Sequence, residues 1–129
     1  MKSEKLLSRH PLNNGLDLEL WDLSHPVAGD RWQVVMEARV LVPLTAATLP
    51  PEFLPQIDQV TAALGREIVF SQQEVRNFIA ASEVAGLLKE MTSRFLSSLT
   101  TYLGHPDFAA GFIRKTFAAY QEKPRWFKS

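Results

Sequence analysis

The chain has 129 residues, of which 46% are hydrophobic and 22% charged, with 14 basic and 14 acidic side chains and no cysteine. This length and composition are typical of one globular domain, and the missing cysteines exclude a disulfide framework and a thiolate metal site. No stretch is apolar for long enough to span a membrane, and the charged N-terminal residues lack the features of a signal peptide, so we expect a cytoplasmic protein.

The charge is distributed unevenly along the chain. Residues 1–9 hold three basic and one acidic side chain, and residues 114–129 hold five basic and one acidic, so the ends carry +2 and +4 and the remainder −6. Basic ends attract an anionic partner or the acidic body of a second copy, and the plainer alternative is that they are solvated tails.

The first elements in chain order are a polar lead and two strands. Residues 1–14 are polar and end in turn-prone residues, so we expect a loop. Leucines alternate with polar residues from Leu16 to Leu23, and after a turn at residues 25–30 every even position from Arg31 to Leu44 is apolar. A period of two predicts half-buried strands, and two such strands joined by a turn predict a hairpin.

The register of this hairpin follows from its charges. Pairing residue numbers that sum to 58 sets Glu19 opposite Arg39, whereas a sum of 56 sets Glu19 opposite Glu37. Like charges directly opposite each other are unfavourable, so we predict the sum of 58.

A short helix and a third strand follow. Pro50 and Pro51 take the chain out of the sheet, and residues 55–64 are expected to form the helix, which Gly65 closes. A third strand then starts at Arg66. Residues 71–79 also show helical spacing, but we predict a strand because the long second strand needs a partner of matching length. We expect this third strand to run antiparallel to the second, because the short helix advances too little for a parallel return.

The last third of the chain is expected to be helical. Apolar residues recur at intervals of three and four from about residue 83 to Gly104, with Ser82 as the expected N-cap, and again from Phe108 to Tyr120. Two amphipathic helices joined by a short loop predict an antiparallel pair over residues 83–122, followed by a basic and aromatic tail at residues 123–129.

Together these elements predict a single α+β domain. Its three-stranded antiparallel sheet has the order 1-2-3, a meander, with a short helix between strands 2 and 3 and two long C-terminal helices packed on one face. Many small folds share this order, so the fold alone does not assign a function.

No motif for catalysis, cofactor or metal binding is present. His10, His25 and His105 each precede a proline, which places them at element boundaries, and none has a second histidine at the spacing of a metal site. There is neither a nucleophile elbow nor a glycine-rich phosphate loop. We therefore expect no catalytic residue, no metal and no cofactor, and we lean against an enzyme.

The polar face of the hairpin is the candidate ligand-binding site. Trp21, Glu37 and Arg39 share this face, with His25 in the adjoining turn. Acidic groups beside an aromatic ring can transfer protons or hold a sugar-like ligand. Two alternatives remain open: a solvated face held by cross-strand ion pairs, and a face that a second protomer covers.

The tail is the candidate partner-binding site. Arg125, Trp126 and Phe127 combine a cation with aromatics, a composition that stacks on single-stranded bases or enters a membrane surface. The acidic body disfavours nucleic acid, and we expect no membrane association. We expect the two aromatic residues to pack on the sheet or on a partner.

These observations favour a binding or protein-interaction module that acts as a homodimer, with a protein as the expected class of partner. The alternative is a small ligand-binding protein or enzyme with a pocket between sheet and helices. A concave site of several hundred Å³ with converging polar groups would favour that alternative.

Overall fold

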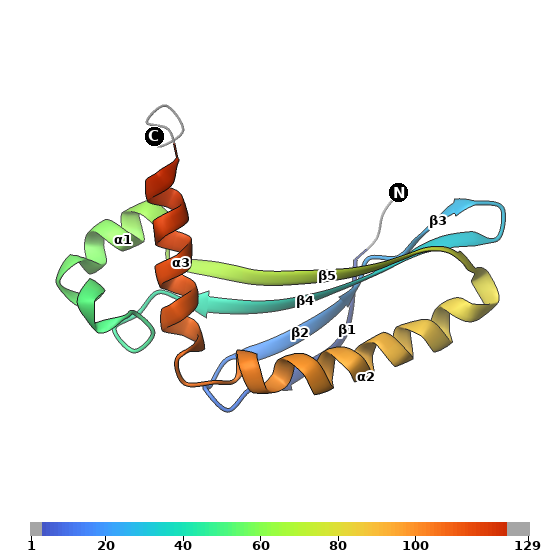
Figure 1. Ribbon diagram of the computed structural model, residues 1–129, viewed down its shortest axis with the longest axis horizontal. Coiled ribbons are helices and arrows are strands. Elements are labelled where there is room, and N and C mark those ends of the chain that lie inside the picture. Colours follow the sequence, from blue (N-terminus) through green and yellow to red (C-terminus); the bar gives the residue numbers. More distant parts are fainter. Residues whose placement is uncertain (1–3, 124–129) are drawn as a thin grey trace.

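The computed structural model describes residues 4–123, which form one sheet and several helices (Figure 1). The strands are β1 (Lys5–Pro11), β2 (Asp17–Asp22), β3 (His25–Ala28), β4 (Arg31–Pro43) and β5 (Glu67–Ala80). The helices are η1 (Pro51–Gln56), α1 (Ile57–Leu64), η2 (Ala81–Glu83), α2 (Val84–Leu103) and α3 (Phe108–Glu122), where η marks a 3₁₀ helix. The predicted α+β class, an antiparallel sheet with packed helices, is confirmed.

The sheet has five strands, so the predicted three-stranded 1-2-3 meander is wrong. β4 lies at its centre: β5 pairs with one edge of β4, β2 and β3 share the other edge, and β1 pairs with the far side of β2. All of these pairings are antiparallel, as predicted for the strand after the short helix.

The expected polar lead contains β1. Lys5, Arg9 and Pro11 are typical of loops, but charged residues and proline are also typical of a strand at the edge of a sheet. Leu7 and Leu12 pack on the core from this segment. Burial of these leucines through tertiary contacts therefore makes a strand of a sequence that reads as a loop.

The expected strand from Leu16 to Leu23 is interrupted at its end. After β2, the Leu23 N–H donates to the Val35 carbonyl at 2.9 Å, and the Ser24 hydroxyl accepts a hydrogen bond from the Val35 N–H at 3.0 Å. The first bond keeps the register of the β2–β4 pairing, whereas in the second a side chain takes the place of a backbone acceptor, and the ladder of backbone bonds stops there. The expected turn at residues 25–30 becomes β3 and a two-residue turn. Gly29 opens that turn with a φ of 55°, which glycine adopts at little cost.

The predicted register of the hairpin is confirmed. Glu19 lies opposite Arg39 and Leu20 opposite Ala38, so the paired numbers sum to 58. The strand predicted for residues 71–79 is also confirmed, because β5 pairs with β4 over nearly its whole length.

A bulge interrupts the pairing of β4 with β5. Trp32 pairs with Ile79 and Val34 with Arg76, so two residues of β5 lie opposite one of β4. Phe78, one of the two, has a φ of 57° and is 71% exposed. The regular part of β5 therefore ends at about Arg76.

The two faces of the sheet differ in what covers them. We call the face toward α2 the inner face. The even residues of β4 lie on it, and all of them except the partly buried Trp32 are fully buried, together with Met91 and Leu103 of α2. Thr92 of α2 contacts Met36 there, with 3.9 Å between Oγ1 and Sδ. The odd residues of β4 lie on the opposite, outer face. Figure 1 shows α2 along one side of the sheet, and α1 and α3 at the end where β5 begins.

The prediction that the two long helices form an antiparallel pair is wrong. α3 turns away from α2 and packs against α1 (Figure 1). Phe108 and Phe112 of α3 meet Phe70 of β5 edge to face, with ring centroids 5.5 and 5.7 Å apart, and Phe117 meets Phe53 of η1 at 5.4 Å. These aromatic contacts direct α3 across the end of the sheet.

The expected cap of α2 is also wrong. Ser82 lies within η2, and the N-cap position is Glu83, whose side chain makes no capping hydrogen bond. At the other end of α2, the Asn14 side chain donates to the carbonyl of Leu103 at 2.8 Å, which ties the helix to the turn between β1 and β2.

An ion pair joins η1 to α3. The Arg114 guanidinium donates to both carboxylate oxygens of Glu52, at 2.6 and 3.1 Å. These bonds, together with a hydrogen bond from the backbone of Glu52, lower the pKa of Glu52 from 4.5 to about 2.

Replacing Arg114 is expected to restore an ordinary acid. In Arg114→Ala, the pKa of Glu52 should rise toward 4.5, because the hydrogen bonds and the positive charge that favour its ionised form are lost. A ¹³C NMR titration of the side-chain carboxyl measures this change. Lys115→Ala is the matched control and should leave the pKa low; a wild-type pKa near 4.5 would show that the two residues do not pair in solution.

Candidate functional site

Three of the four residues predicted for a ligand site come together on the outer face. Trp21 lies opposite Glu37 across the β2–β4 pairing, and the Arg39 guanidinium carbon lies 4.7 Å from the centre of the Trp21 ring. Arg39 also donates hydrogen bonds to Glu37 and, at 3.0 Å, to Glu4. Arg39 therefore sits between an aromatic face and two carboxylates.

A second ion pair extends this network toward β1. The Arg9 side chain donates to Oε2 of Glu19 at 2.6 and 3.1 Å, and Nε1 of Trp21 donates to Oε1 of the same carboxylate at 3.1 Å. Gln73 of β5 donates to Oε1 of Glu37 at 2.7 Å. The polar atoms of the network therefore engage one another across four strands.

The environment keeps the carboxylates of this network ionised. Partial burial acts to raise the pKa of Glu37, but hydrogen bonds from Gln73 and Arg39 and the charge of Arg39 outweigh it and lower the pKa. Burial also acts to raise the pKa of Glu19. The hydrogen bonds from Trp21 and Arg9 and the charges of the nearby arginines outweigh it and lower the pKa. A general acid needs a raised pKa, so neither carboxylate is suited to donate a proton at neutral pH.

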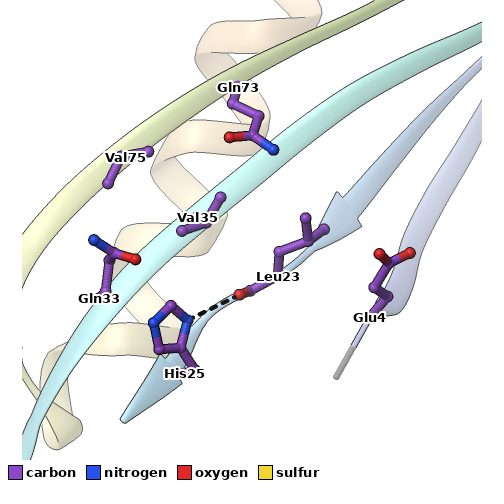
Figure 2. A pocket seen from close by; sticks show the side chains of 7 residues that line it. All are labelled: Glu4, Leu23, His25, Gln33, Val35, Gln73 and Val75. Carbon is purple, nitrogen blue, oxygen red and sulfur yellow. Dashed lines mark hydrogen bonds between the residues drawn. The ribbon is translucent and has the colours of Figure 1, made fainter. Parts of the chain in front are cut away.

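His25 lines a separate pocket on the outer face (Figure 2). This pocket has a volume of about 210 Å³, and its wall includes Glu4, Gln33, Gln73 and Val75. Figure 2 shows α2 behind the sheet and the His25 ring beside the Leu23 carbonyl, 3.4 Å from Nδ1. The pocket touches the polar network through Gln73 and Glu4 but contains none of Trp21, Glu37 and Arg39.

The far edge of β5 pairs with no strand among residues 4–123. The Leu44 N–H donates to the Arg66 carbonyl at 2.8 Å, so the even residues that follow on β5 direct their backbone groups toward β4. Residues alternate in this respect along an antiparallel ladder. The odd residues therefore point their N–H and C=O groups to the free edge; they are Glu67, Val69, Ser71, Gln73 and Val75.

The free edges of the sheet, on β1, β3 and β5, differ in their protection against pairing. The β1 edge carries Lys5, Arg9 and Pro11 and has an irregular register between Leu6 and Ser8, all features that discourage another strand from adding. From residue 68 to residue 73, β5 has neither a charged residue nor a proline. The outer side of β3 also pairs with no strand, but β3 has only four residues and contains Pro26, so β5 offers the longest unprotected edge in the described part of the chain.

A groove follows this open edge where α3 crosses it. The groove has a volume of about 450 Å³ and lies between Val69, Phe70 and Ser71 on the strand and the helix residues Gly111, Phe112, Lys115, Thr116 and Ala119. Val69 and Ser71 belong to the outer face and Phe70 to the inner face, so the groove lies at the edge itself.

The groove does not follow from the sequence pattern of α3. By their spacing, Phe108, Phe112, Ile113, Phe117 and Tyr120 belong to one apolar stripe, but in the structure Phe108, Ile113 and Phe117 are buried in the core and Phe112 lines the groove. The sequence signal for a second contact surface was an apolar stripe too wide for one surface, with Gly111 beside the margin that holds Phe108 and Phe112.

The predicted partner-binding residues Arg125, Trp126 and Phe127 lie outside the described residues. Within residues 4–123 there is no group of three histidine or acidic side chains that could hold a metal ion, and no helix long and apolar enough to span a membrane. No protein-family model matches the chain, and comparisons with curated proteins and with solved structures found no match.

Proposed function

We propose that this domain is a protein-interaction module that binds an extended segment of its partner as an additional strand on the free edge of β5. The observation that carries this proposal is the row of outward-pointing backbone groups of Val69, Ser71 and Gln73, in a stretch of β5 from residue 68 to residue 73 that has neither a charged residue nor a proline. Such an edge is a template for pairing, and main-chain hydrogen bonds to an edge are a recurring basis of peptide recognition.

The surroundings of the predicted ligand-site residues support this function over a ligand site on the outer face. The pocket at His25, about 210 Å³, is smaller than the roughly 300–1,000 Å³ typical of small-molecule sites. Trp21, Glu37 and Arg39 use their polar atoms on one another and on neighbouring residues. A ligand would have to displace these bonds before it could form its own.

Random twelve-residue peptides displayed on phage test the proposal. We expect the domain to capture peptides whose binding shifts the amide NMR signals of Val69, Ser71 and Gln73. Ser71→Pro should weaken the selected peptides by about tenfold or more, because proline removes a donor that faces the partner and blocks its approach. The fold should tolerate this change, since the Ser71 N–H does not bond to β4.

Ser71→Ala is the matched control, because it removes the hydroxyl and keeps the N–H, and it should bind as the wild type does. Thermal unfolding of both variants checks that they fold. Failure to capture any peptide, or equal binding by the Ser71→Pro variant, would overturn the proposal.

Exposed apolar residues on the outer face favour a second candidate partner, another copy of this chain. Val69 is 52% exposed and Val75 40%. Antiparallel pairing of two β5 edges about Gln72 would set Val69 opposite Val75 of the second copy, twice by symmetry. A homodimer in the cytoplasm, as the sequence suggested, belongs to this candidate.

Light scattering across a concentration series tests self-pairing. We expect a dimer that Ser71→Pro converts to a monomer and Ser71→Ala leaves intact. A wild-type monomer at all concentrations would exclude the second copy as partner.

A further inference from the structure

The groove beside β5 continues into a second hollow. That hollow, about 190 Å³, shares Tyr102, Gly111 and Phe112 with the groove and extends to Phe108, His105 and Asp107 at the start of α3. A strand added at Val69 to Ser71 would lie beside this combined surface, so some of its side chains would point into it.

Aromatic rings form the floor of this surface. Phe108 and Phe112 are stacked with centroids 5.8 Å apart, and Tyr102 meets Phe108 edge to face at 5.5 Å. Tyr102 is 59% exposed, an unusual exposure for so large a ring. An incoming aromatic side chain can therefore add to an existing cluster of rings.

Gly111 leaves space above this floor. No atom lies within 4 Å of the place that a Cβ on Gly111 would occupy. A glycine within α3 weakens the helix, yet any other side chain here would stand in the groove.

The charges at the two ends of the surface differ. Lys115 lines one end and forms no ion pair within residues 4–123, whereas its neighbour Arg114 is bound to Glu52. Asp107, whose side chain is 90% exposed, lies at the other end. A carboxylate on a partner would be attracted to the Lys115 end and repelled from the Asp107 end.

We infer that the groove selects an extended peptide that carries a large aromatic side chain over Gly111 and an acidic residue beside Lys115. This inference rests on the proposed strand addition at β5 and adds the chemistry of the partner to it. The backbone of β5 supplies affinity for any extended chain, and the groove supplies the choice of side chain.

Three parallel selections from the same random phage library test the inference, on the wild type, Gly111→Leu and Lys115→Glu. Peptides from the wild type should be enriched in an aromatic residue with a nearby Asp or Glu. The most enriched peptide, synthesised with a fluorescein label, should bind Gly111→Leu about tenfold or more weakly, which is the scale of a lost buried aromatic contact. Gly86→Leu is the matched control, because it is also a helical glycine with no atom within 4 Å of its Cβ position, away from the groove.

A charge exchange tests the acidic residue. Lys115→Glu should weaken the labelled peptide by about fivefold or more, as for a charge pair at the rim of an interface. A peptide with lysine in place of its acid should bind Lys115→Glu better than it binds the wild type. Loss of packing alone would not produce this reversal.

The outcomes separate the inference from the proposed function. Peptides that bind the β5 edge without these side-chain preferences, or equally well to Gly111→Leu, would overturn the inference and leave strand addition standing. Failure of all peptides to bind the β5 edge would overturn both.

Discussion

Leu20→Ala is expected to destabilise the domain by about 3 kcal/mol, within the range of about 2–5 kcal/mol for removing a buried leucine side chain. Leu20 is fully buried on the inner face. Its cross-strand neighbours are Ser8 and Ala38, which are too small to fill the cavity that the substitution leaves. For a domain of ordinary stability, about 5–15 kcal/mol, this is a large share of the total.

Urea denaturation followed by circular dichroism measures the loss. Leu41→Ala is the matched control, because Leu41 lies on the outer face of the same sheet and is 49% exposed. We expect it to cost less than about 1 kcal/mol, as for surface substitutions. Equal costs at the two positions would mean that α2 does not cover the inner face in solution.

Arg39→Ala is expected to cost about 2 kcal/mol at neutral pH, between the values for exposed and fully buried ion pairs. Glu37 is only 9% exposed, and without Arg39 its carboxylate keeps the hydrogen bond from Gln73 but no cation. The Trp21 ring also loses the guanidinium above it.

The cost of Arg39→Ala should depend on pH. Because the pKa of Glu37 is lower in the folded than in the unfolded state, its ionisation stabilises the fold above the ordinary pKa of 4.5, and this contribution is lost as pH falls through the folded-state value. In Arg39→Ala, burial is opposed only by Gln73, so the pKa rises and the contribution shrinks. The variant therefore loses most at neutral pH and approaches the wild type in acid.

Free energies of unfolding in urea, measured at about pH 7 and about pH 3, give this comparison. Arg31→Ala serves as the control, since Arg31 and Asp30 form an exposed pair at 3.7 Å whose removal should change little at either pH. An unchanged difference between wild type and Arg39→Ala at the two pH values would show that the network does not act through the charge of Glu37.

One of the two candidate sites could be predicted from the sequence and the other could not. Trp21, Glu37 and Arg39 are brought together as expected, because neighbours across a hairpin follow from a register and from alternation along each strand. The role of these residues as a ligand site stays a prediction. The β5 edge and its groove could not be predicted, because a strand has a free edge only in relation to every other strand of the sheet.

Local patterns are enough to predict the elements with an unambiguous period and the one strand pairing with a decisive charge. The even positions of β4 are apolar without exception, the stripe of α2 repeats over several turns, and of the two hairpin registers compared only the sum of 58 sets a basic residue of β4, Arg39, opposite Glu19. These are local patterns, so the physical reason for each element lies within the element or its nearest partner.

The remaining features depend on contacts between distant parts of the chain. β1 is a strand because β2 offers an edge and the core accepts Leu7 and Leu12, although its own residues resemble a loop. α3 leaves α2 because Phe70 and Phe53, far away in the chain, supply aromatic surfaces for it to bury. Burial against distant residues outweighs the preference of two helices with a short connection to pack together, and that choice creates the groove beside β5.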